Sequence, residues 1–193
     1  MHMARVPKSR QERVQSRDKS SLNREQSFPI VGIGASAGGL EAISELLRHI
    51  PERTGLAFVL IEHLDPSHRS NLSEILSRNA HIPVEEVREG TVVEPDHAYV
   101  IPPNMGLYIE GGTLHLAPRQ PQVPNLPVDR FFCSLAAERK HRSIAVILSG
   151  TASDGVEGCR VIKEAGGITF AQTEASAKYS GMPQSAVDAG CVD

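Results

Sequence analysis

Three residues of this 193-residue chain have the side-chain types needed for nucleophilic catalysis, and each comes shortly after an apolar segment. They are Ser36, His63 and Asp154. In an acyl-transfer triad the serine attacks a carbonyl carbon, the histidine takes the serine proton, and the aspartate orients the imidazole and stabilises its cation. The sequence therefore contains a candidate nucleophile, a candidate base and a candidate orienting carboxylate.

Backbone N–H groups near the serine are candidates for an oxyanion hole. Ser36 lies in the segment Ala35-Ser-Ala-Gly-Gly39, whose glycines favour a sharp turn from a strand into a helix. The first N–H groups of a helix have no partner within the helix and point toward such a turn. Each donor to a developing oxyanion is worth about 3 kcal/mol. We expect Ala37 to supply one donor and Thr151, shortly before Asp154, to supply a second.

The same glycine-containing segment is also typical of phosphate binding. Gly32, Gly34 and Ala37 match a G-x-G-x-x-A dinucleotide fingerprint. Glu62 ends the next apolar segment, where proteins with this fingerprint bind a ribose hydroxyl. A nucleotide-binding domain is therefore an alternative interpretation.

Other residues compete for parts of the candidate site. Taken alone, His63 is typical of a structural histidine and Asp154 of a helix N-cap. Three further aspartates are weaker candidates for the orienting carboxylate: Asp65, Asp96 and Asp129. Arg69 and Arg78 are candidates for substrate recognition from a helix after His63, although solvated surface arginines are the simpler interpretation.

The elements that must position these residues alternate between strand and helix patterns. Continuous apolar segments predict buried strands at 29–34, 56–61, 143–148 and 168–171. One-sided apolar spacing predicts helices at 40–50, near 72–76, at 128–139 and at 156–165. This alternation predicts an α/β fold with a mostly parallel, doubly wound sheet, helices on both faces and a small β-hairpin insertion within 84–117. The ends of parallel strands share one edge, so the three candidates are expected to converge there.

Composition divides the chain into two parts. Residues 1–27 carry seven lysines and arginines against three acidic residues, with almost no large apolar side chains, so we expect a disordered basic tail. Residues 28–193 are expected to form one α/β domain. Because Gly190–Asp193 has the pattern of a beginning strand, we expect this domain to be truncated at its C-terminal end.

Composition also argues against several classes of function. A net charge of −3, 4% aromatic residues and the lack of tryptophan argue against nucleic-acid binding. No apolar segment approaches the roughly 18 residues of a membrane helix, and no leader-like segment is evident, so we expect a cytoplasmic protein without membrane insertion. The cysteines and histidines lack metal-ligand spacing, so we expect no metal and no cofactor.

Five segments together resemble the catalytic domain of the chemotaxis receptor methylesterases, the CheB-type protein-glutamate methylesterases. In chain order they are Ile33-Gly-Ala-Ser-Ala-Gly-Gly39, Glu62-His-Leu-Asp-Pro66, Tyr99-Val-Ile-Pro-Pro103, Leu148-Ser-Gly-Thr-Ala-Ser-Asp-Gly155 and Gly181-Met-Pro183. The resemblance implies Ser36 as nucleophile, His63 as base and Asp154 as orienting carboxylate. It also implies hydrolysis of glutamate γ-methyl esters through a glutamyl-enzyme, with glutamine deamidation as a second reaction of some members.

The resemblance implies a partner as well, the cytoplasmic tail of a methyl-accepting chemotaxis-type receptor. Residues 62–78 are most similar to variants fused to methyltransferase and sensor domains. Two positions depart from the family pattern: Ala37 stands where threonine is usual, and Thr151-Ala152 stands where Met-Gly is frequent. These departures keep a second hypothesis open, a catalytically weak or inactive sensory or docking module of a larger signalling protein.

Overall fold

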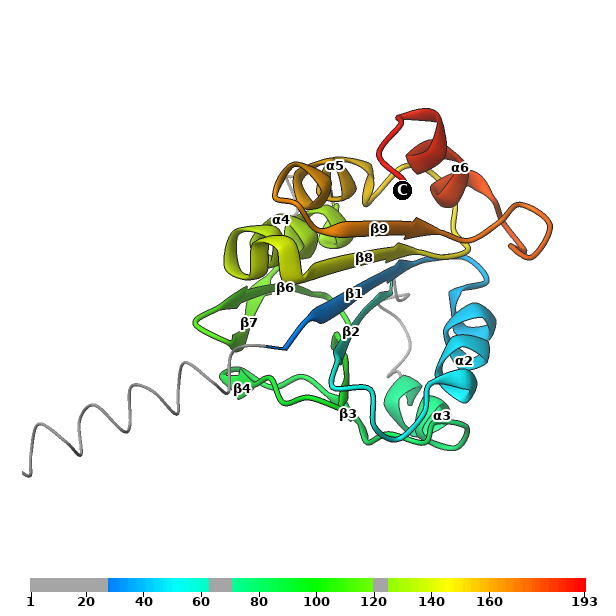
Figure 1. Cartoon of the computed structure of the whole chain (residues 1–193). Coiled ribbons are helices and arrows are strands. Elements are labelled where there is room, and N and C mark those ends of the chain that lie inside the picture. Colours follow the sequence, from blue (N-terminus) through cyan, green and yellow to red (C-terminus); the bar gives the residue numbers. More distant parts are fainter. Residues whose placement is uncertain (1–27, 63–70, 120–124) are drawn as a thin grey trace, which may run out of the picture.

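A parallel sheet of six strands forms the centre of the computed structural model, which describes residues 28–62, 71–119 and 125–193 (Figure 1). The strand order is β3-β5-β2-β1-β8-β9, and every pairing in it is parallel. The strands are β1 (Ile30–Ala35), β2 (Ala57–Glu62), β3 (Val84–Glu86), β5 (Ala98–Val100), β8 (Ser143–Ile147) and β9 (Ile168–Ala171). The predicted α/β fold is confirmed.

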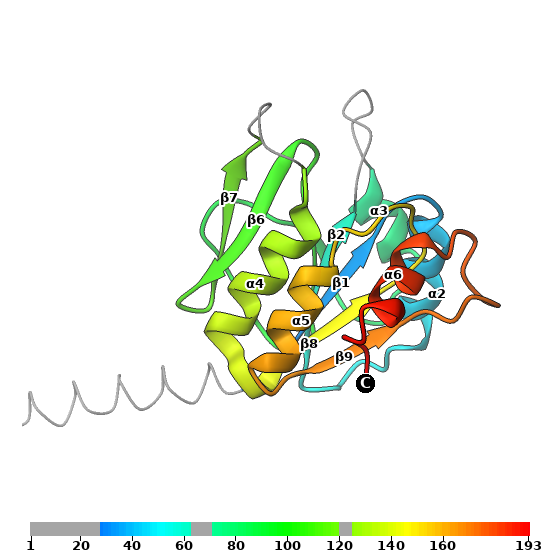
Figure 2. The ribbon, with the colours of Figure 1, turned by 90° about the horizontal axis from the view of Figure 1, so that it is seen from above.

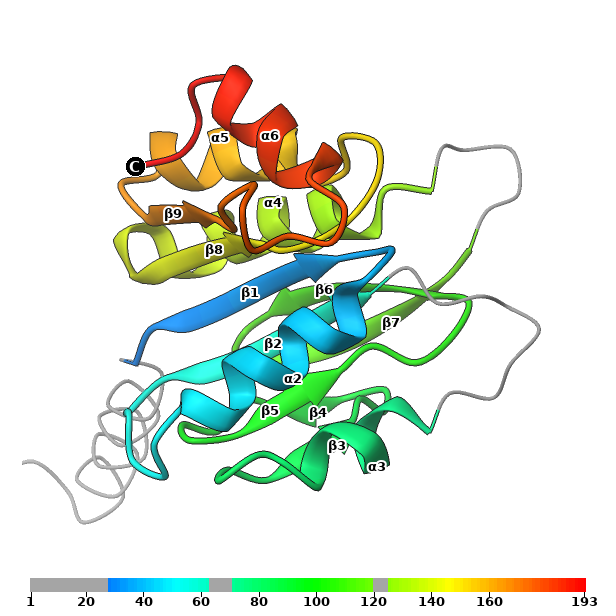
Figure 3. The same ribbon diagram turned by 90° about the vertical axis from the view of Figure 1, so that its right-hand side faces the viewer.

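Helices cover both faces of this sheet (Figures 2 and 3). α2 (Gly39–His49) and α3 (Leu72–Ser77) lie on one face. The other face carries α4 (Pro127–Arg139), which a short 3-10 turn η1 (Lys140–Arg142) extends, α5 (Val156–Glu164) and α6 (Gly181–Asp188). Within the described ranges, every helix is too short or too polar to cross a lipid bilayer.

Two apolar clusters fill the space between the sheet and its helices. Ile43 and Leu47 of α2 are fully buried in one cluster, and Phe131 and Phe132 of α4 in the other. Successive residues of β2 from Ala57 to Ile61 enter the two clusters in turn. A strand that is covered on both faces has no polar side, which is why its sequence is continuously apolar.

A second, antiparallel sheet of three strands packs beside α4. It contains β4 (Thr91–Val92), β6 (Met105–Glu110) and β7 (Thr113–Pro118), in the order β4-β7-β6. The predicted hairpin insertion is therefore present as β6 and β7. The same stretch also supplies β3 and β5 to the main sheet, which the sequence analysis did not predict. Both strands have only three residues, so their pattern was too short to separate from the hairpin.

The predicted helices and strands agree with the structure to within one or two residues, but the strand expected to begin at Gly190–Asp193 does not form. Asp193 N–H donates to Thr169 C=O of β9, at 3.2 Å. The Asp193 carboxylate then accepts the return bond from Thr169 N–H, at 3.0 Å, in place of a backbone carbonyl. The tail predicted at 1–27 lies outside the described residues.

Helix α4 lies close against β1 because β1 has glycine at two positions beneath it. A Cβ added to Gly32 would lie 2.7 Å from Phe132 Cε1, and one added to Gly34 would overlap Val128. Both glycines lie inside β1, not in the turn that follows it. Helix packing therefore accounts for them, and the dinucleotide fingerprint, which needs its glycines in the turn, is not supported.

We predict that Gly34→Ala lowers the free energy of unfolding by about 1–3 kcal/mol, because overpacking forces α4 away from β1. The control is Gly106→Ala in β6, where the nearest atom to the new Cβ is the flexible end of Arg130, at 3.0 Å. Urea denaturation measures both. In a Val128→Ala background Gly34→Ala should cost less, and equal costs in the two backgrounds would contradict the proposed contact.

Candidate active site

The carboxyl ends of β1, β2 and β8 lie side by side at one edge of the sheet. Ala35 is in register with Glu62 of β2, and Gly34 with Ile147 of β8. Beyond the strands, Ser36 N–H donates to Ser149 C=O, at 3.0 Å. The structure therefore places Ser36 against the segment that leads from β8 to Asp154.

Ser36 occupies a tight turn that connects β1 to α2. Gly39 N–H donates to Ser36 C=O, at 2.7 Å, and Gly38 has a φ of +74°, which favours glycine. The C=O and N–H of one trans peptide point in opposite directions, and the described residues contain no cis peptide. Because Ser36 C=O points into the first turn of α2, Ala37 N–H points away from it. Among the described residues no protein acceptor receives this N–H.

The segment after β8 passes close to Ser36. A Cβ added to Gly150 would lie 3.1 Å from Ser36 Cβ and would overlap the Met182 sulfur. Gly150 N–H donates to Tyr179 C=O and Gly150 C=O accepts from Met182 N–H, both at 2.9 Å. Thr151, the next residue, is exposed, and its N–H has no acceptor in the described part of the chain. Of the two expected oxyanion donors, Ala37 thus follows Ser36 in the chain, and Thr151 follows Gly150, which lies close to Ser36.

Asp154 is 3% exposed and caps α4. Its two carboxylate oxygens accept from Val128 N–H, at 3.1 Å, and from Asp129 N–H, at 3.0 Å. These are among the N–H groups that a helix start leaves without internal partners. The sequence pattern is typical of a cap on the following helix, but the capped helix is α4, which precedes Asp154 in the chain. Two backbone N–H groups of α4 therefore help to fix the position of the carboxylate.

Two of the competing aspartates, Asp129 and Asp96, accept hydrogen bonds from backbone N–H groups. Asp129 accepts from Gly158 N–H in the first turn of α5, at 2.8 Å, so it caps α5 while Asp154 caps α4. Burial raises the pKa of the Asp129 carboxyl, and the nearby Asp154 charge acts in the same direction. Asp96 accepts from Thr54 N–H and Gly55 N–H before the start of β2, at the opposite edge of the sheet. Hydrogen bonds from these N–H groups lower the pKa of Asp96.

The structure describes only some of the remaining candidate residues. His63, Asp65 and Arg69 lie outside the described residues. Glu62 is described, at the end of β2 beside Ala35. Arg78 forms an exposed ion pair with Glu74, at 3.0 Å, on α3. This pair agrees with the solvated interpretation of that arginine.

Sequence reasoning missed Ser149, which is fully buried beside the Ser36 turn. Its hydroxyl donates to Ala37 C=O, at 2.8 Å, and accepts from Tyr179 N–H, at 3.0 Å. Its N–H donates to Gln172 Oε1, at 2.8 Å. The available signal was a polar residue placed directly after a buried strand, although serine is also common in turns that serve no site.

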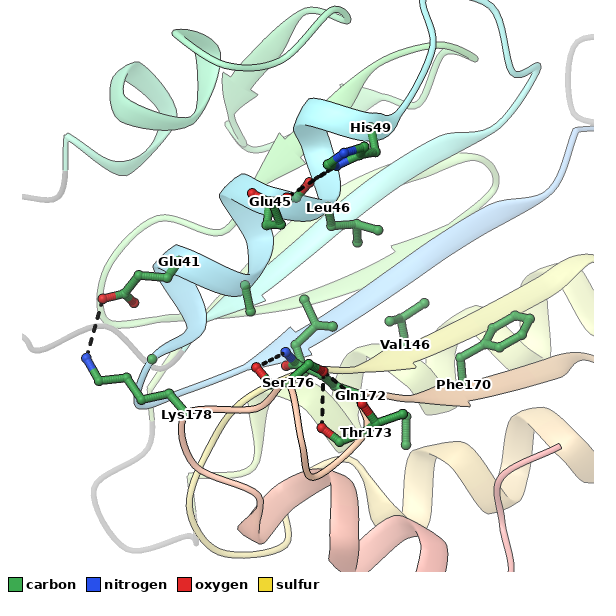
Figure 4. Close-up of a pocket in the computed structure, with 14 residues that line it drawn as sticks. Glu41, Glu45, Leu46, His49, Val146, Phe170, Gln172, Thr173, Ser176 and Lys178 are labelled. Atoms are coloured by element: carbon green, nitrogen blue, oxygen red, sulfur yellow. Dashed lines mark hydrogen bonds and ion pairs between the residues drawn. The ribbon is translucent and has the colours of Figure 1, made fainter.

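A groove of about 620 Å³ begins beside the Ser36 turn and runs along α2 (Figure 4). Gly38 and Lys178 line one end, and Lys178 Nζ lies 3.5 Å from Glu41 Oε1. The apolar floor comes from β8 and β9 and includes Val146 and Phe170, of which Phe170 is half exposed. Ionic groups on the rim are mainly paired with one another, so the groove has no strong net charge of its own.

We predict that Asp154→Ala lowers the free energy of unfolding by about 2 kcal/mol, because two buried N–H groups of α4 lose their acceptors. Asp154→Asn keeps one acceptor oxygen and should lose less. Asp188→Ala on α6, where the carboxylate is exposed, is the control. Chemical denaturation gives all three values. Equal stability of Asp154→Ala and the wild-type protein would contradict the capping role.

Known proteins match this chain over nearly all of its described residues. The family model described as CheB methylesterase matches residues 31–193. The crystal structure of the Thermotoga maritima CheB methylesterase catalytic domain superposes with a TM-score of 0.79 and 28% sequence identity, covering 86% of this chain and 91% of that one.

Curated relatives carry the name protein-glutamate methylesterase/protein-glutamine glutaminase. The Geobacillus kaustophilus protein is 36% identical over 85% of this chain and 49% of its own length. The Pseudomonas aeruginosa protein numbered 1 is 31% identical over 90% of this chain and 48% of its own length. The chain thus spans about half the length of these relatives. By the extent of these matches, the chain belongs to the CheB methylesterase family.

Proposed function

We propose that this domain hydrolyses glutamate γ-methyl esters on the cytoplasmic tail of a chemotaxis-type receptor, and deamidates glutamine at such positions as a second reaction. The observation that carries the proposal is the setting of Ser36. It lies in the turn before α2, and a Cβ added to Gly150 would lie 3.1 Å from Ser36 Cβ. The N–H groups of Ala37 and Thr151 have no acceptor among the described residues. This arrangement has the parts of a serine nucleophile with an oxyanion hole. The names of the curated relatives support the substrate class.

In the proposed reaction Ser36 Oγ attacks the ester carbonyl carbon while His63 takes the hydroxyl proton. The tetrahedral oxyanion accepts hydrogen bonds from Ala37 N–H and Thr151 N–H. The carbon–oxygen bond to the methoxy group then breaks, and methanol leaves with the proton from His63. Water, deprotonated by His63, then attacks the glutamyl ester on Ser36. The bond from the carbonyl carbon to Ser36 Oγ breaks, His63 returns the proton to Oγ, and the glutamate carboxyl group is released.

Asp154 is proposed to orient His63 and to stabilise its cation. The role is supported by the position of the carboxylate, which two N–H groups at the start of α4 hold in place. A carboxylate has about four acceptor sites, so it can accept an imidazole N–H as well as these two backbone bonds. The positive end of the α4 dipole also favours the negative charge of Asp154.

The two departures from the family pattern leave the proposed donors intact. Both Ala37 and Thr151 act through backbone N–H groups, which every residue except proline provides. Compared with the threonine that is usual in the family, Ala37 lacks only the side-chain hydroxyl and its methyl group. The departures are therefore compatible with an active enzyme, and they do not favour the docking-module hypothesis.

We also propose that the domain works as part of a larger signalling protein located in the cytoplasm, fused to methyltransferase and sensor domains. A 104.1 kDa protein of Rhodobacter capsulatus supports an arrangement of several domains, because it is 39% identical over 63% of this chain while the match covers 13% of its own length.

Methanol release from a methyl-esterified receptor tail tests the function. We predict that Ser36→Ala lowers kcat by at least about a thousandfold, because it removes the attacking atom while keeping the turn. Ser44→Ala on α2 is the matched control and should retain wild-type activity. Circular dichroism checks that all three proteins are folded. Wild-type turnover that persists in folded Ser36→Ala would exclude the proposed nucleophile, and no release from the folded wild-type protein would exclude the function.

A further inference from the structure

Ser149 connects three segments that come from different parts of the chain. Its backbone C=O accepts from Ser36 N–H, at 3.0 Å, and its hydroxyl donates to Ala37 C=O, at 2.8 Å. The same hydroxyl accepts from Tyr179 N–H, at 3.0 Å. The side chain is fully buried, so these bonds do not compete with bulk water. A bonded hydroxyl in this setting restricts both segments that it joins.

On one side, Ser149 completes the restraint of the Ser36 turn. Three consecutive peptide groups of that turn are held by hydrogen bonds: Ser36 N–H by Ser149 C=O, Ser36 C=O by Gly39 N–H, and Ala37 C=O by the Ser149 hydroxyl. The middle group carries Ala37 N–H. Its direction is therefore set by the groups on both sides, and the Ser149 hydroxyl provides the only one of these three restraints that depends on a side chain.

On the other side, Ser149 restrains the segment that carries Thr151. The hydroxyl holds Tyr179 N–H, and Tyr179 C=O in turn accepts from Gly150 N–H, at 2.9 Å. Gly150 immediately precedes Thr151. The packing around the hydroxyl is tight, since a Cβ added to Gly38 would lie 2.8 Å from Ser149 Oγ. One hydroxyl is thus linked by hydrogen bonds to both segments that carry the backbone donors proposed for the oxyanion.

We infer that Ser149 is a positioning residue whose hydroxyl sets the relative orientation of Ala37 N–H and Thr151 N–H. The inference rests on the proposed function, because it concerns the same oxyanion. Hydrogen bonds to an oxyanion act mainly in the transition state, so poorly oriented donors lower kcat more than they raise KM. Ser149 itself does not touch the reacting atoms.

A matched pair of serine variants separates positioning from stability. Ser134 on α4 makes the same two kinds of bond away from the site: its hydroxyl donates to Phe131 C=O, at 2.8 Å, and accepts from Ile109 N–H, at 3.1 Å. Ser149→Ala and Ser134→Ala each remove one such hydroxyl. We predict that Ser149→Ala lowers kcat for methanol release about tenfold with KM changed less than twofold, whereas Ser134→Ala leaves both constants unchanged.

Amide hydrogen exchange measured by NMR tests the positioning without relying on turnover. Each variant frees one N–H directly, Tyr179 in Ser149→Ala and Ile109 in Ser134→Ala. We predict that Ser149→Ala also speeds exchange at Ser36 and Gly39 about tenfold, and that Ser134→Ala does not.

The outcomes are distinguishable. If the wild-type protein releases no methanol, the proposed function fails, and the exchange rates alone decide whether Ser149 fixes the turn. If the wild-type protein is active and Ser149→Ala matches Ser134→Ala in kcat, KM and exchange at Ser36 and Gly39, the positioning role is wrong. A lower kcat with faster exchange at the turn supports it.

Discussion

The site depends on one backbone hydrogen bond, from Ser36 N–H to Ser149 C=O, at 3.0 Å. It extends the parallel pairing of β1 and β8 beyond the ends of both strands. The turn that carries Ser36 and the segment that leads to Asp154 therefore leave the sheet together. Parallel strands end at the same edge, so this pairing brings residues more than a hundred positions apart in the sequence to one edge of the sheet.

Helix α4 links the packing of the fold to the proposed chemistry. The glycines of β1 allow α4 to lie close to the sheet, and the first N–H groups of α4 then hold the Asp154 carboxylate. Asp129 in the first turn of α4 in turn caps α5, by accepting from Gly158 N–H. These reciprocal caps make the position of Asp154 depend on how α4 and α5 pack on the sheet.

Much of this arrangement follows from sequence patterns, and the remainder depends on contacts between distant segments. Continuous apolar segments identified β1, β2, β8 and β9, because strands covered on both faces leave a strong signal. The three-residue strands β3 and β5 were missed, since so short a segment has no distinct period. Ser36 and Asp154 were placed at the correct edge, whereas the capping of α4 by Asp154 and the bonds of Ser149 were not predictable, because their partners are backbone groups far along the chain.

Labelling with a fluorophosphonate, followed by peptide mass spectrometry, tests the central claim most directly, because such a reagent reacts with a serine that has an activating base and an oxyanion hole. The account predicts one adduct, on the peptide that contains Ser36, and its loss in both His63→Ala and Asp154→Asn. The absence of an adduct at Ser36 in the folded wild-type protein would contradict the proposed Ser36–His63–Asp154 triad. So would labelling of Ser36 in both variants at the rate of the wild-type protein.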